Sequence, residues 1–324
     1  MRPIKIENGE VWVLDQRLLP TREKWTKISS AEDAYNAIKT MVVRGAPLIG
    51  VVAAYGLALT AKKVKDVSEY IKIGEWLKTA RPTAINLMWA VDRVLNSSKD
   101  EVNFVKAWEE ASKIFNEELE NAKKIGENGE PLFKDGDTVL THCNAGALAT
   151  VDYGTALAPL RVAKEKGKKI KVFATETRPV MQGARLTTYE LAKDGFDVTL
   201  IADTAVGLTM MKGYINKVIV GADRVLKDGT TINKIGTFQV ATLAKRFNIP
   251  FYVALPSSTL DLKSKVEDVV IEERPSEEIF YIKGKRIAPR GIKAFNPAFD
   301  ITPPELITAI ITEKGVYYPP FNFT

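Results

Sequence analysis

The residues with the most distinctive chemistry stand together in the stretch VLTHCNAGALAT (139–150), which holds the chain's single histidine, His142, and its single cysteine, Cys143. Neighbouring side chains in a strand point to opposite faces, so a direct His142–Cys143 pair is not expected. One Cys and one His also lack the spaced ligand set of a zinc site. Two interpretations of Cys143 stay open. It is either a buried small apolar residue or a thiol activated by a small-residue turn that opens a helix.

Asp223 is the second candidate, because it follows the apolar run KVIVGA. An ionisable group at the end of a buried strand is costly unless it is paired or solvated. It either forms an ion pair with Arg224, or it is a carboxyl kept protonated by apolar surroundings that can give and take a proton.

Cationic groups near helix starts form a third set, and they suit an anionic ligand. Asn233 and Lys234 precede Gly236 and a predicted helix, where a phosphate could be held. Arg44 and Arg81 each stand at a turn before a predicted helix, and a guanidinium can bind a phosphate through two hydrogen bonds. The alternative for each of these residues is an ordinary solvated side chain.

The secondary structure expected to position these groups changes along the chain. Up to about Lys124 the apolar spacing predicts helices, preceded by short strands in the first 25 or so residues. After the Gly- and Pro-containing stretch 126–137, short apolar strands alternate with amphipathic helices, which predicts right-handed βαβ units and a parallel sheet. Ligands of such sheets bind beyond the carboxyl ends of the strands. The expected strands deliver these groups there: His142–Asn144, Thr175–Arg178, Asp203–Thr204, Gly221–Arg224 and Pro256–Thr259.

The sequence therefore predicts an α/β protein with two domains. Residues 1–126 are expected to form a mainly helical N-terminal domain with short strands at its start. Residues 127–324 are expected to form a Rossmann-like catalytic domain with a parallel sheet.

Composition excludes several classes of function. The chain has 324 residues, 45% of them apolar, and its net charge of +6 comes from basic residues interleaved with acidic ones, unlike a nucleic-acid-binding stripe. No apolar run is long enough for a membrane span, and the N-terminus lacks a signal-peptide pattern, so we expect a cytoplasmic protein. One cysteine suits a reducing compartment, and many Lys and Glu residues suggest a thermophile. The G-x-G-x-x-G, P-loop and G-x-S-x-G motifs are absent.

Eight stretches together resemble the methylthioribose-1-phosphate isomerases of methionine salvage. That family shares a superfamily with ribose-1,5-bisphosphate isomerase and with regulatory subunits of the translation-initiation exchange factor. The resemblance covers nearly the whole chain: VVRGAPLIGVVAAYG, RPTAINLMWAVDR, THCNAGALATVDYGTALAP, ETRPVMQGARLTTYEL, VIVGADRV, NKIGTFQVA, FYVALPSSTLDL and FNPAFDITPPELITAIITEKGV.

The resemblance implies an aldose–ketose isomerase with Cys143 as the catalytic cysteine and Asp223 as the catalytic acid. It also implies substrate-binding roles for Arg44, Gly45, Ala46, Arg81, Gln182, Asn233 and Lys234. The implied substrate is a small phosphosugar, and the implied assembly is a homodimer that uses no metal and no cofactor. The alternatives are a ribose-1,5-bisphosphate isomerase with the same Cys and Asp, and a non-enzymatic regulatory subunit that would not need this pair.

Overall fold

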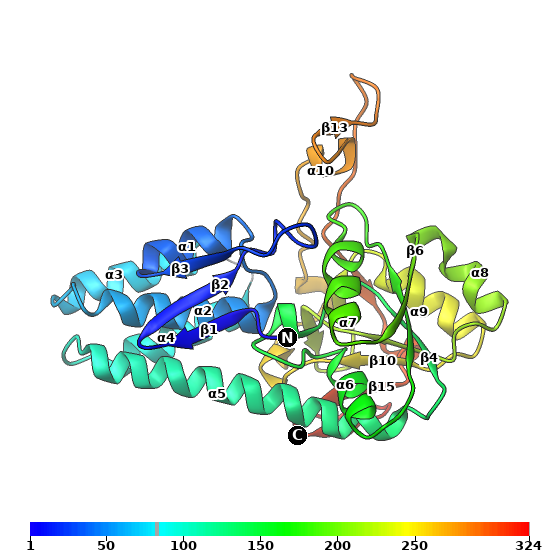
Figure 1. Ribbon diagram of the computed structural model, residues 1–324, viewed down its shortest axis with the longest axis horizontal. Coiled ribbons are helices and arrows are strands. Elements are labelled where there is room, and N and C mark those ends of the chain that lie inside the picture. Colours follow the sequence, from blue (N-terminus) through cyan, green and yellow to red (C-terminus); the bar gives the residue numbers. More distant parts are fainter. Residues whose placement is uncertain (82–83, 324) are drawn as a thin grey trace. The chain divides into compact units, whose positions relative to one another are not determined.

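The computed structural model describes residues 1–81 and 84–323 (Figure 1). Pro82 and Thr83 of the RPTAIN motif, and Thr324, lie outside the described residues. The chain forms two compact units: Met1–Gly126 with Ala145–Ala158 (unit 1), and Glu127–Asn144 with Pro159–Thr324 (unit 2). The domain boundary predicted between residues 126 and 127 stays a proposal. No pattern in the sequence predicted that the segment Ala145–Ala158 belongs to unit 1.

Unit 1 is mainly helical, as predicted. A small antiparallel sheet at its start has the order β1-β2-β3, and helices α1 to α5 follow. The bounds are β1 (Ile4–Glu7), β2 (Glu10–Leu14), β3 (Trp25–Ile28), α1 (Ala31–Lys39), α2 (Ala46–Thr60), α3 (Val67–Lys78), α4 (Ile85–Ser97) and α5 (Phe104–Gly129). Ser30 caps α1 by accepting a hydrogen bond from the Asp33 N–H. The apolar α2 is buried along nearly its whole length, so it forms the centre of this unit.

Unit 2 contains the predicted parallel sheet. Within the described residues, its strands have the order β16-β15-β10-β7-β4-β5-β6, and only the pairing of β15 with β16 is antiparallel. The strands are β4 (Thr138–Thr141), β5 (Lys171–Thr175), β6 (Asp197–Ile201), β7 (Lys217–Val220), β10 (Phe251–Ala254), β15 (Ala309–Thr312) and β16 (Gly315–Tyr317). The parallel strands run in the order 3-2-1-4-5-6, counted along the chain. This order has its switch point between β4 and β7.

Helices cover both faces of this sheet, as βαβ crossovers require (Figure 1). Helices α8 (Val206–Met211) and α9 (Thr237–Arg246) pack on one face, and their apolar residues share a core with β4, β7 and β10. Helices α6 (Ala158–Glu165) and α7 (Thr188–Lys193) lie on the other face. A π-helix, Gly183–Thr187, precedes α7.

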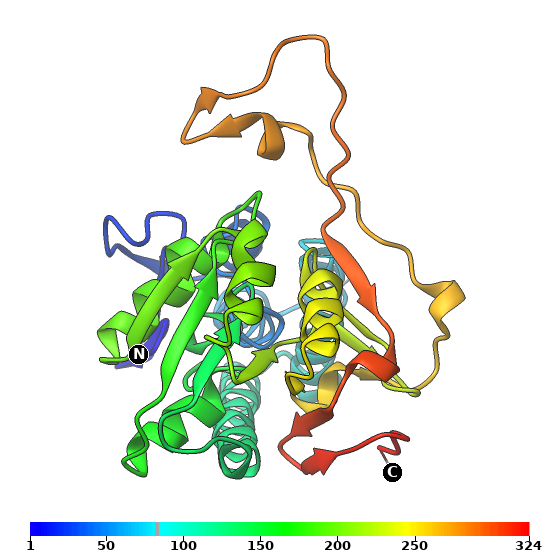
Figure 2. The ribbon, with the colours of Figure 1, turned by 90° about the vertical axis from the view of Figure 1, so that its right-hand side faces the viewer.

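A second sheet in unit 2 was not predicted. Its order is β11-β8-β9-β14, made of β8 (Arg224–Leu226), β9 (Thr231–Lys234), β11 (Leu260–Asp261) and β14 (Phe299–Thr302). Between β11 and β14 the chain makes a long excursion that carries α10 (Glu277–Phe280) and the hairpin of β12 (Tyr281–Ile282) and β13 (Lys285–Arg286). Figure 2 shows this excursion extending away from the sheets. The second sheet matters for function because β9 carries Asn233 and Lys234.

Candidate active site

The two candidate catalytic residues leave neighbouring strands at the same edge of the large sheet. Strand β4 pairs in parallel with β7, with Val139 opposite Lys217 and Leu140 opposite Val218. Cys143 follows β4 and Asp223 follows β7. The structure therefore places both residues in the loops that flank the switch point, where open α/β sheets bind their ligands.

Cys143 occupies a backbone conformation that is unusual for a residue with a side chain. Its φ is 65°, in the left-handed region, and its side chain is buried. The expectation that a helix opens directly after this turn is wrong, because only the three-residue 3-10 turn Ala147–Ala149 follows and α6 begins at Ala158. Hydrogen bonds hold the Cys143 backbone instead. Its N–H donates to Thr177 Oγ1 (2.9 Å), and its carbonyl accepts from Thr187 Oγ1 (2.6 Å).

His142 does not form a catalytic pair with its neighbour Cys143, because both of its ring nitrogens have other hydrogen-bond partners. Nε2 lies 2.8 Å from the carbonyl oxygen of Ile235, and Nδ1 lies 2.7 Å from Thr175 Oγ1. A carbonyl can only accept, so Nε2 carries the proton and Nδ1 accepts from the threonine hydroxyl. Burial lowers the pKa of His142, which keeps the ring neutral, and the hydrogen bond to Ile235 and the charge of Asp203 oppose this only in part. His142 therefore links the end of β4 to the loop after Lys234.

Asn144, the next residue, anchors the turn to a buried ionic cluster. Its Nδ2 donates to Glu190 Oε1 (2.6 Å) and to Thr187 Oγ1 (3.1 Å). The Glu190 side chain is fully buried and pairs with Arg161 (2.7 Å), which also binds Asp194. Burial disfavours the charged guanidinium, yet the two carboxylates raise the pKa of Arg161 above its ordinary value. Nothing in the local sequence pattern pointed to this cluster, because its members are far apart along the chain.

Asp223 lies in the tight connection between β7 and β8. Its N–H donates to the carbonyl oxygen of Ile232 on β9 (3.0 Å), which fixes the backbone of the turn. Its side chain is exposed, so the apolar surroundings expected from the sequence are not present around it. The guanidinium of Arg224, the ion-pair partner considered for Asp223, lies 3.6 Å from the Asp261 carboxylate.

Gln182 stands just before the π-helix and is 8% exposed. Its Oε1 is buried and accepts no hydrogen bond from the described residues. A buried acceptor without a partner costs free energy, of the order of 1–3 kcal/mol. Such an atom is suited to accept a hydrogen bond from a hydroxyl group of a ligand.

Asn233 and Lys234 lie on β9 rather than in a loop. Asn233 is buried and its Nδ2 donates to Thr237 Oγ1 (2.9 Å). The Lys234 ammonium donates to the carbonyl oxygen of Ala298 (3.0 Å) and lies 4.6 Å from the centre of the Phe299 ring. These contacts hold both side chains beside the start of α9.

Asp300 occupies the helix start that the sequence suggested for a phosphate. Its carboxylate accepts from the N–H groups of Gly236 (2.7 Å) and Phe238 (3.1 Å). Burial raises the pKa of Asp300 to about 6, although these two bonds and the charge of Lys234 act in the opposite direction. Sequence reasoning missed Asp300, since it lies on β14, far along the chain from α9. Lys234 and Asn233 thus stand beside a helix start whose Gly236 and Phe238 N–H groups are already bound by Asp300.

The remaining predicted ligand residues belong to unit 1. Arg44 and the N-cap Gly45 directly precede α2, which begins at Ala46 and has Pro47 in its first turn. Gly45 has a φ of 98°, and a Cβ atom there would lie 2.3 Å from the carbonyl oxygen of Ala149, so only glycine fits. Arg81 is half-buried and stands before α4.

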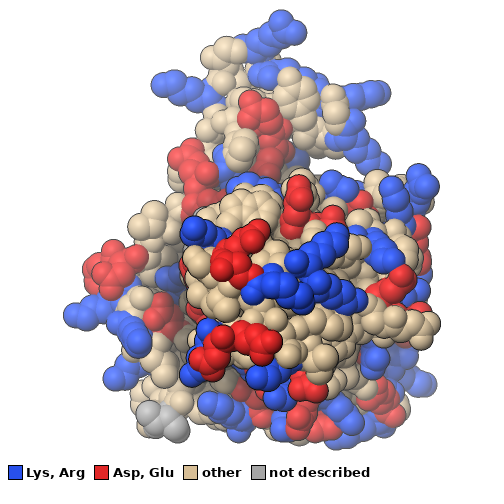
Figure 3. All heavy atoms as spheres, turned by 90° about the vertical axis from the view of Figure 1, so that its left-hand side faces the viewer, with Lys and Arg blue, Asp and Glu red and all other residues tan. Residues whose placement is uncertain are grey.

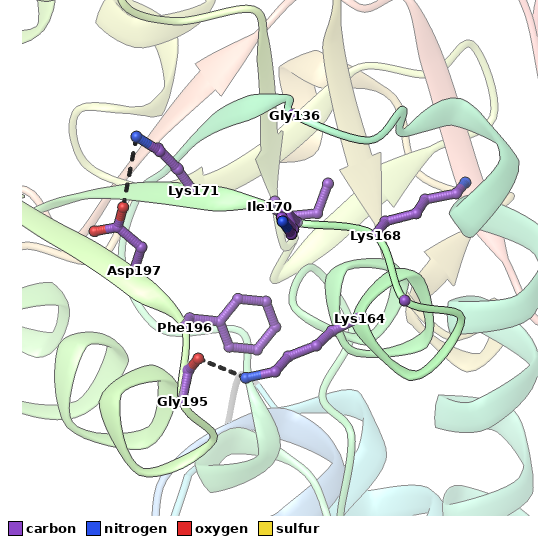
Figure 4. Close-up of a pocket in the computed structure, with 10 residues that line it drawn as sticks. Gly136, Lys164, Lys168, Ile170, Lys171, Gly195, Phe196 and Asp197 are labelled. Carbon is purple, nitrogen blue, oxygen red and sulfur yellow. Dashed lines mark hydrogen bonds and ion pairs between the residues drawn. The ribbon is translucent and has the colours of Figure 1, made fainter.

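A separate cavity of about 590 Å³ lies in unit 2, near the amino ends of β5 and β6 (Figure 4). Its wall includes Phe196 and Ile170 together with several lysines. Lys164 Nζ donates to the Gly195 carbonyl oxygen (2.5 Å), and the Lys171 ammonium lies 3.7 Å from the Asp197 carboxylate. This cavity is at the opposite ends of the strands from Cys143 and Asp223, so it is not part of the candidate site.

The described surface carries charged side chains of both signs. On the face shown in Figure 3, Lys and Arg side chains are interspersed with Asp and Glu. Over residues 1–81 and 84–323, no group of three or more His, Cys, Asp or Glu side chains is placed to hold a metal ion. No helix in the same part of the chain has the length and apolar character needed to cross a membrane.

Comparisons with known proteins agree with the geometry. A model of the initiation factor 2 subunit family matches residues 42–319. A protein of Thermosipho africanus named methylthioribose-1-phosphate isomerase is 55% identical, over 97% of this chain and 94% of the relative. The structure of 5-methylthioribose 1-phosphate isomerase from Pyrococcus horikoshii OT3 superimposes with a TM-score of 0.92 at 43% identity, covering 99% of this chain and 93% of the other. The structure described as translation initiation factor eIF-2B, subunit delta, from A. fulgidus gives a TM-score of 0.90 at 48% identity. The match covers 99% of this chain and 96% of the other.

Proposed function

Because the chain belongs to the initiation factor 2 subunit family, and within it to the methylthioribose-1-phosphate isomerases, we propose that it converts 5-methylthio-α-ribose 1-phosphate to 5-methylthioribulose 1-phosphate in methionine salvage. The observation that carries this proposal is the 55% identity over nearly the whole chain to a relative named for that activity. The placement of Cys143 and Asp223 beside the switch point supports it. The protein is an isomerase of a phosphorylated sugar.

The reaction poses a chemical difficulty that defines the groups it needs. The anomeric oxygen of the substrate carries a phosphate, so the ring cannot open to a free aldehyde. The ring oxygen must gain a proton while its bond to C1 breaks, and a hydrogen must move from C2 to C1. One proton donor and one proton acceptor on different sides of the sugar meet these requirements.

We assign the proton donor to Asp223 and the acceptor to Cys143. Asp223 protonates the ring oxygen, and the Cys143 thiolate removes the C2 proton to leave an enol at C1 and C2. The proton returned to C1 and the proton lost from the C2 hydroxyl complete the ketose. In the rival route the hydrogen moves from C2 to C1 as a hydride, and Cys143 only shapes and polarises the site. Either route benefits when water is kept from the reactive intermediate.

The proposed ligand residues offer two kinds of group. Gln182, Asn233 and Lys234 belong to unit 2, and Arg44, Gly45, Ala46 and Arg81 belong to unit 1. The amide and ammonium groups suit sugar hydroxyls and phosphate oxygens, while the guanidinium groups suit a phosphate. The unpartnered Oε1 of Gln182 supports its assignment to a substrate hydroxyl.

Further parts of the proposal follow from the reaction and from the resemblance. The hydrogen moves within one molecule, so no external oxidant or reductant is needed, and we propose that the enzyme uses no cofactor. We also propose a homodimer in the cytoplasm. Light scattering during gel filtration gives the mass directly, and a mass equal to one chain of 35.9 kDa would refute the dimer.

A substrate panel tests the proposed function. The purified protein is offered 5-methylthioribose 1-phosphate, ribose 1,5-bisphosphate and ribose 1-phosphate without added metal, and ketose formation is followed. Turnover of the methylthio sugar alone is expected. Preference for the bisphosphate would move the same residues to the other isomerase of the superfamily. No turnover by a folded protein would refute both enzymes and favour a regulatory subunit. Exchange of the C2 hydrogen with solvent deuterium during turnover would support the route through the enol.

A further inference from the structure

The turn that carries Cys143 faces a second turn with the same unusual backbone. Thr177, after β5, has a φ of 62°, close to the 65° of Cys143. Residues with a side chain persist in this region only where their surroundings hold them. Two such residues at the ends of neighbouring strands indicate that this edge of the sheet is built to hold a particular geometry.

The Thr177 hydroxyl is the direct connection between the two turns. It accepts the Cys143 N–H at 2.9 Å, and both side chains are buried. As a donor the same hydroxyl has, among residues 1–81 and 84–323, only the distant acceptors of Thr175, the carbonyl oxygen at 3.4 Å and Oγ1 at 3.3 Å. Its well-formed hydrogen bond is therefore the one to Cys143.

Asp203, at the end of β6, holds Thr177 in turn. Its two carboxylate oxygens accept the N–H groups of Thr177 (2.8 Å) and Arg178 (2.7 Å). Charge-assisted bonds of this kind are stronger than those between neutral groups. A chain of hydrogen bonds thus runs across three adjacent strand ends, from Asp203 to Thr177 to Cys143.

We propose that Thr177, held by Asp203, is a positioning residue that fixes the left-handed conformation of Cys143 and so aims its thiol. Thr177 acts through the Cys143 backbone, and no step of the reaction passes through its hydroxyl. The part of the proposal that concerns turnover rests on the proposed isomerase activity. The part that concerns the accessibility of the Cys143 thiol is independent of the proposed isomerase activity.

The test compares Thr177→Val, which keeps the shape of the side chain but removes the acceptor, with Thr177→Ser, which keeps the acceptor. Thr177→Val is expected to lower kcat about 10- to 100-fold while KM changes less than threefold, since positioning affects the reacting geometry more than substrate binding. Thr177→Ser is expected to stay within about threefold of the wild type. The matched control is Thr199→Val at an exposed position within β6, which should leave both constants unchanged.

Alkylation of the thiol by iodoacetamide provides a readout that does not depend on activity. Cys143 is the only cysteine, so each alkylated molecule reports on this residue. With the turn released, the buried thiol is expected to react at least threefold faster in Thr177→Val, well below its melting temperature, and Thr177→Ser should restore the wild-type rate. If Thr177→Val loses thermal stability but keeps the wild-type alkylation rate, the hydroxyl is merely structural and the proposal is overturned.

Asp203→Asn keeps the test decisive if Thr177→Val does not fold. An amide has one oxygen, so it can accept only one of the two N–H groups, and a smaller increase in the alkylation rate is expected. A wild-type rate in this variant would equally overturn the proposal. A wild type that turns over no sugar phosphate would refute the proposed function, yet the alkylation rates would still decide the role of Thr177.

Discussion

The imidazole of His142 donates a hydrogen bond from Nε2 to the carbonyl oxygen of Ile235 at 2.8 Å, and so joins the strand end that carries Cys143 to the loop beside Lys234. This explains why the single histidine and the single cysteine are neighbours. Cys143 is the proposed catalytic residue, and His142 holds together two segments that are distant in sequence.

The first prediction concerns the protonation of His142. Because burial lowers its pKa below the ordinary value of 6.5, the ring should stay neutral through the neutral pH range with the proton on Nε2. Nitrogen-15 NMR of the imidazole checks this without ambiguity, since the chain has one histidine. A ring that titrates between pH 6.5 and 7.5, or a proton found on Nδ1, would contradict the assigned hydrogen bonds.

The second prediction concerns the proposed catalytic pair. Asp223→Asn should fold normally and lose at least about 100-fold in kcat, because the amide cannot protonate the ring oxygen. Cys143→Ser should lose activity to a similar degree on the enol route, and much less if the hydrogen moves as a hydride. Kinetics with 5-methylthioribose 1-phosphate measure both. Substrate should also slow the alkylation of Cys143, and equal rates with and without substrate would remove the thiol from the site.

The third prediction uses the raised pKa of Asp300. Its pKa rises from 3.8 in the unfolded chain to about 6 in the folded one, so the folded state binds a proton more tightly. Protonation of Asp300 contributes fully to the free energy of unfolding below about pH 4, and this contribution is lost as the pH rises through about 6. The loss is at most about 3 kcal/mol. Denaturant unfolding of wild type and Asp300→Asn at several pH values measures it. The wild type should lose stability relative to the variant over this range, and parallel pH profiles would show that Asp300 does not titrate there.

The fourth prediction concerns the buried pair of Arg161 and Glu190. Arg161→Met leaves the fully buried carboxylate of Glu190 without its cation, which should lower the free energy of unfolding by about 3–5 kcal/mol. The control is Lys124→Met, which removes a cation from an exposed pair with Glu120 and should leave the free energy of unfolding nearly unchanged. Similar losses of unfolding free energy in the two variants would mean that the buried pair stabilises the fold no more than the exposed pair does.

The fifth prediction compares two glycines in helical segments. A Cβ atom on Gly183 would lie 1.7 Å from the carbonyl oxygen of Thr175, so Gly183→Ala must displace backbone and should cost at least about 2 kcal/mol. Gly207 in α8 has its nearest neighbour 3.6 Å from such an atom, and Gly207→Ala should be neutral or stabilising by about 0.5–1 kcal/mol. Thermal unfolding of both variants checks the contrast, which would be refuted by equal melting temperatures.

The sequence was sufficient to predict the parallel sheet and the place of the candidate site. Runs such as VIVGA (218–222) and FYVALP (251–256) are apolar throughout because these strands are buried on both faces, and the alternation with helices implies parallel order. The polar residues after each run then had to meet at one edge. The alternation of strands and helices predicts Cys143 and Asp223 at this edge, and the structure places them after the neighbouring strands β4 and β7.

What could not be predicted depends on contacts between distant segments. The strand that carries Asn233 and Lys234 exists because it pairs with β14, where Asp300 lies opposite Asn233. Local apolar spacing holds no information on such a partner. The same limit applies to the Asp300 cap of α9 and to the left-handed turn of Cys143, which is held by threonines from other elements.

The path of the chain between the two units has a consequence for how the gene could be divided. Val151 lies in the core cluster of unit 1, although it is encoded beyond the end of α5 and after Cys143. A cut between codons 126 and 127 would therefore deprive the first fragment of part of its own interior. Neither of the two separately expressed polypeptides would contain a complete unit 1. The codons for unit 1 are therefore interrupted by codons for unit 2. A gene-splitting experiment that keeps each folded unit whole would have to move codons 145–158 together with codons 1–126.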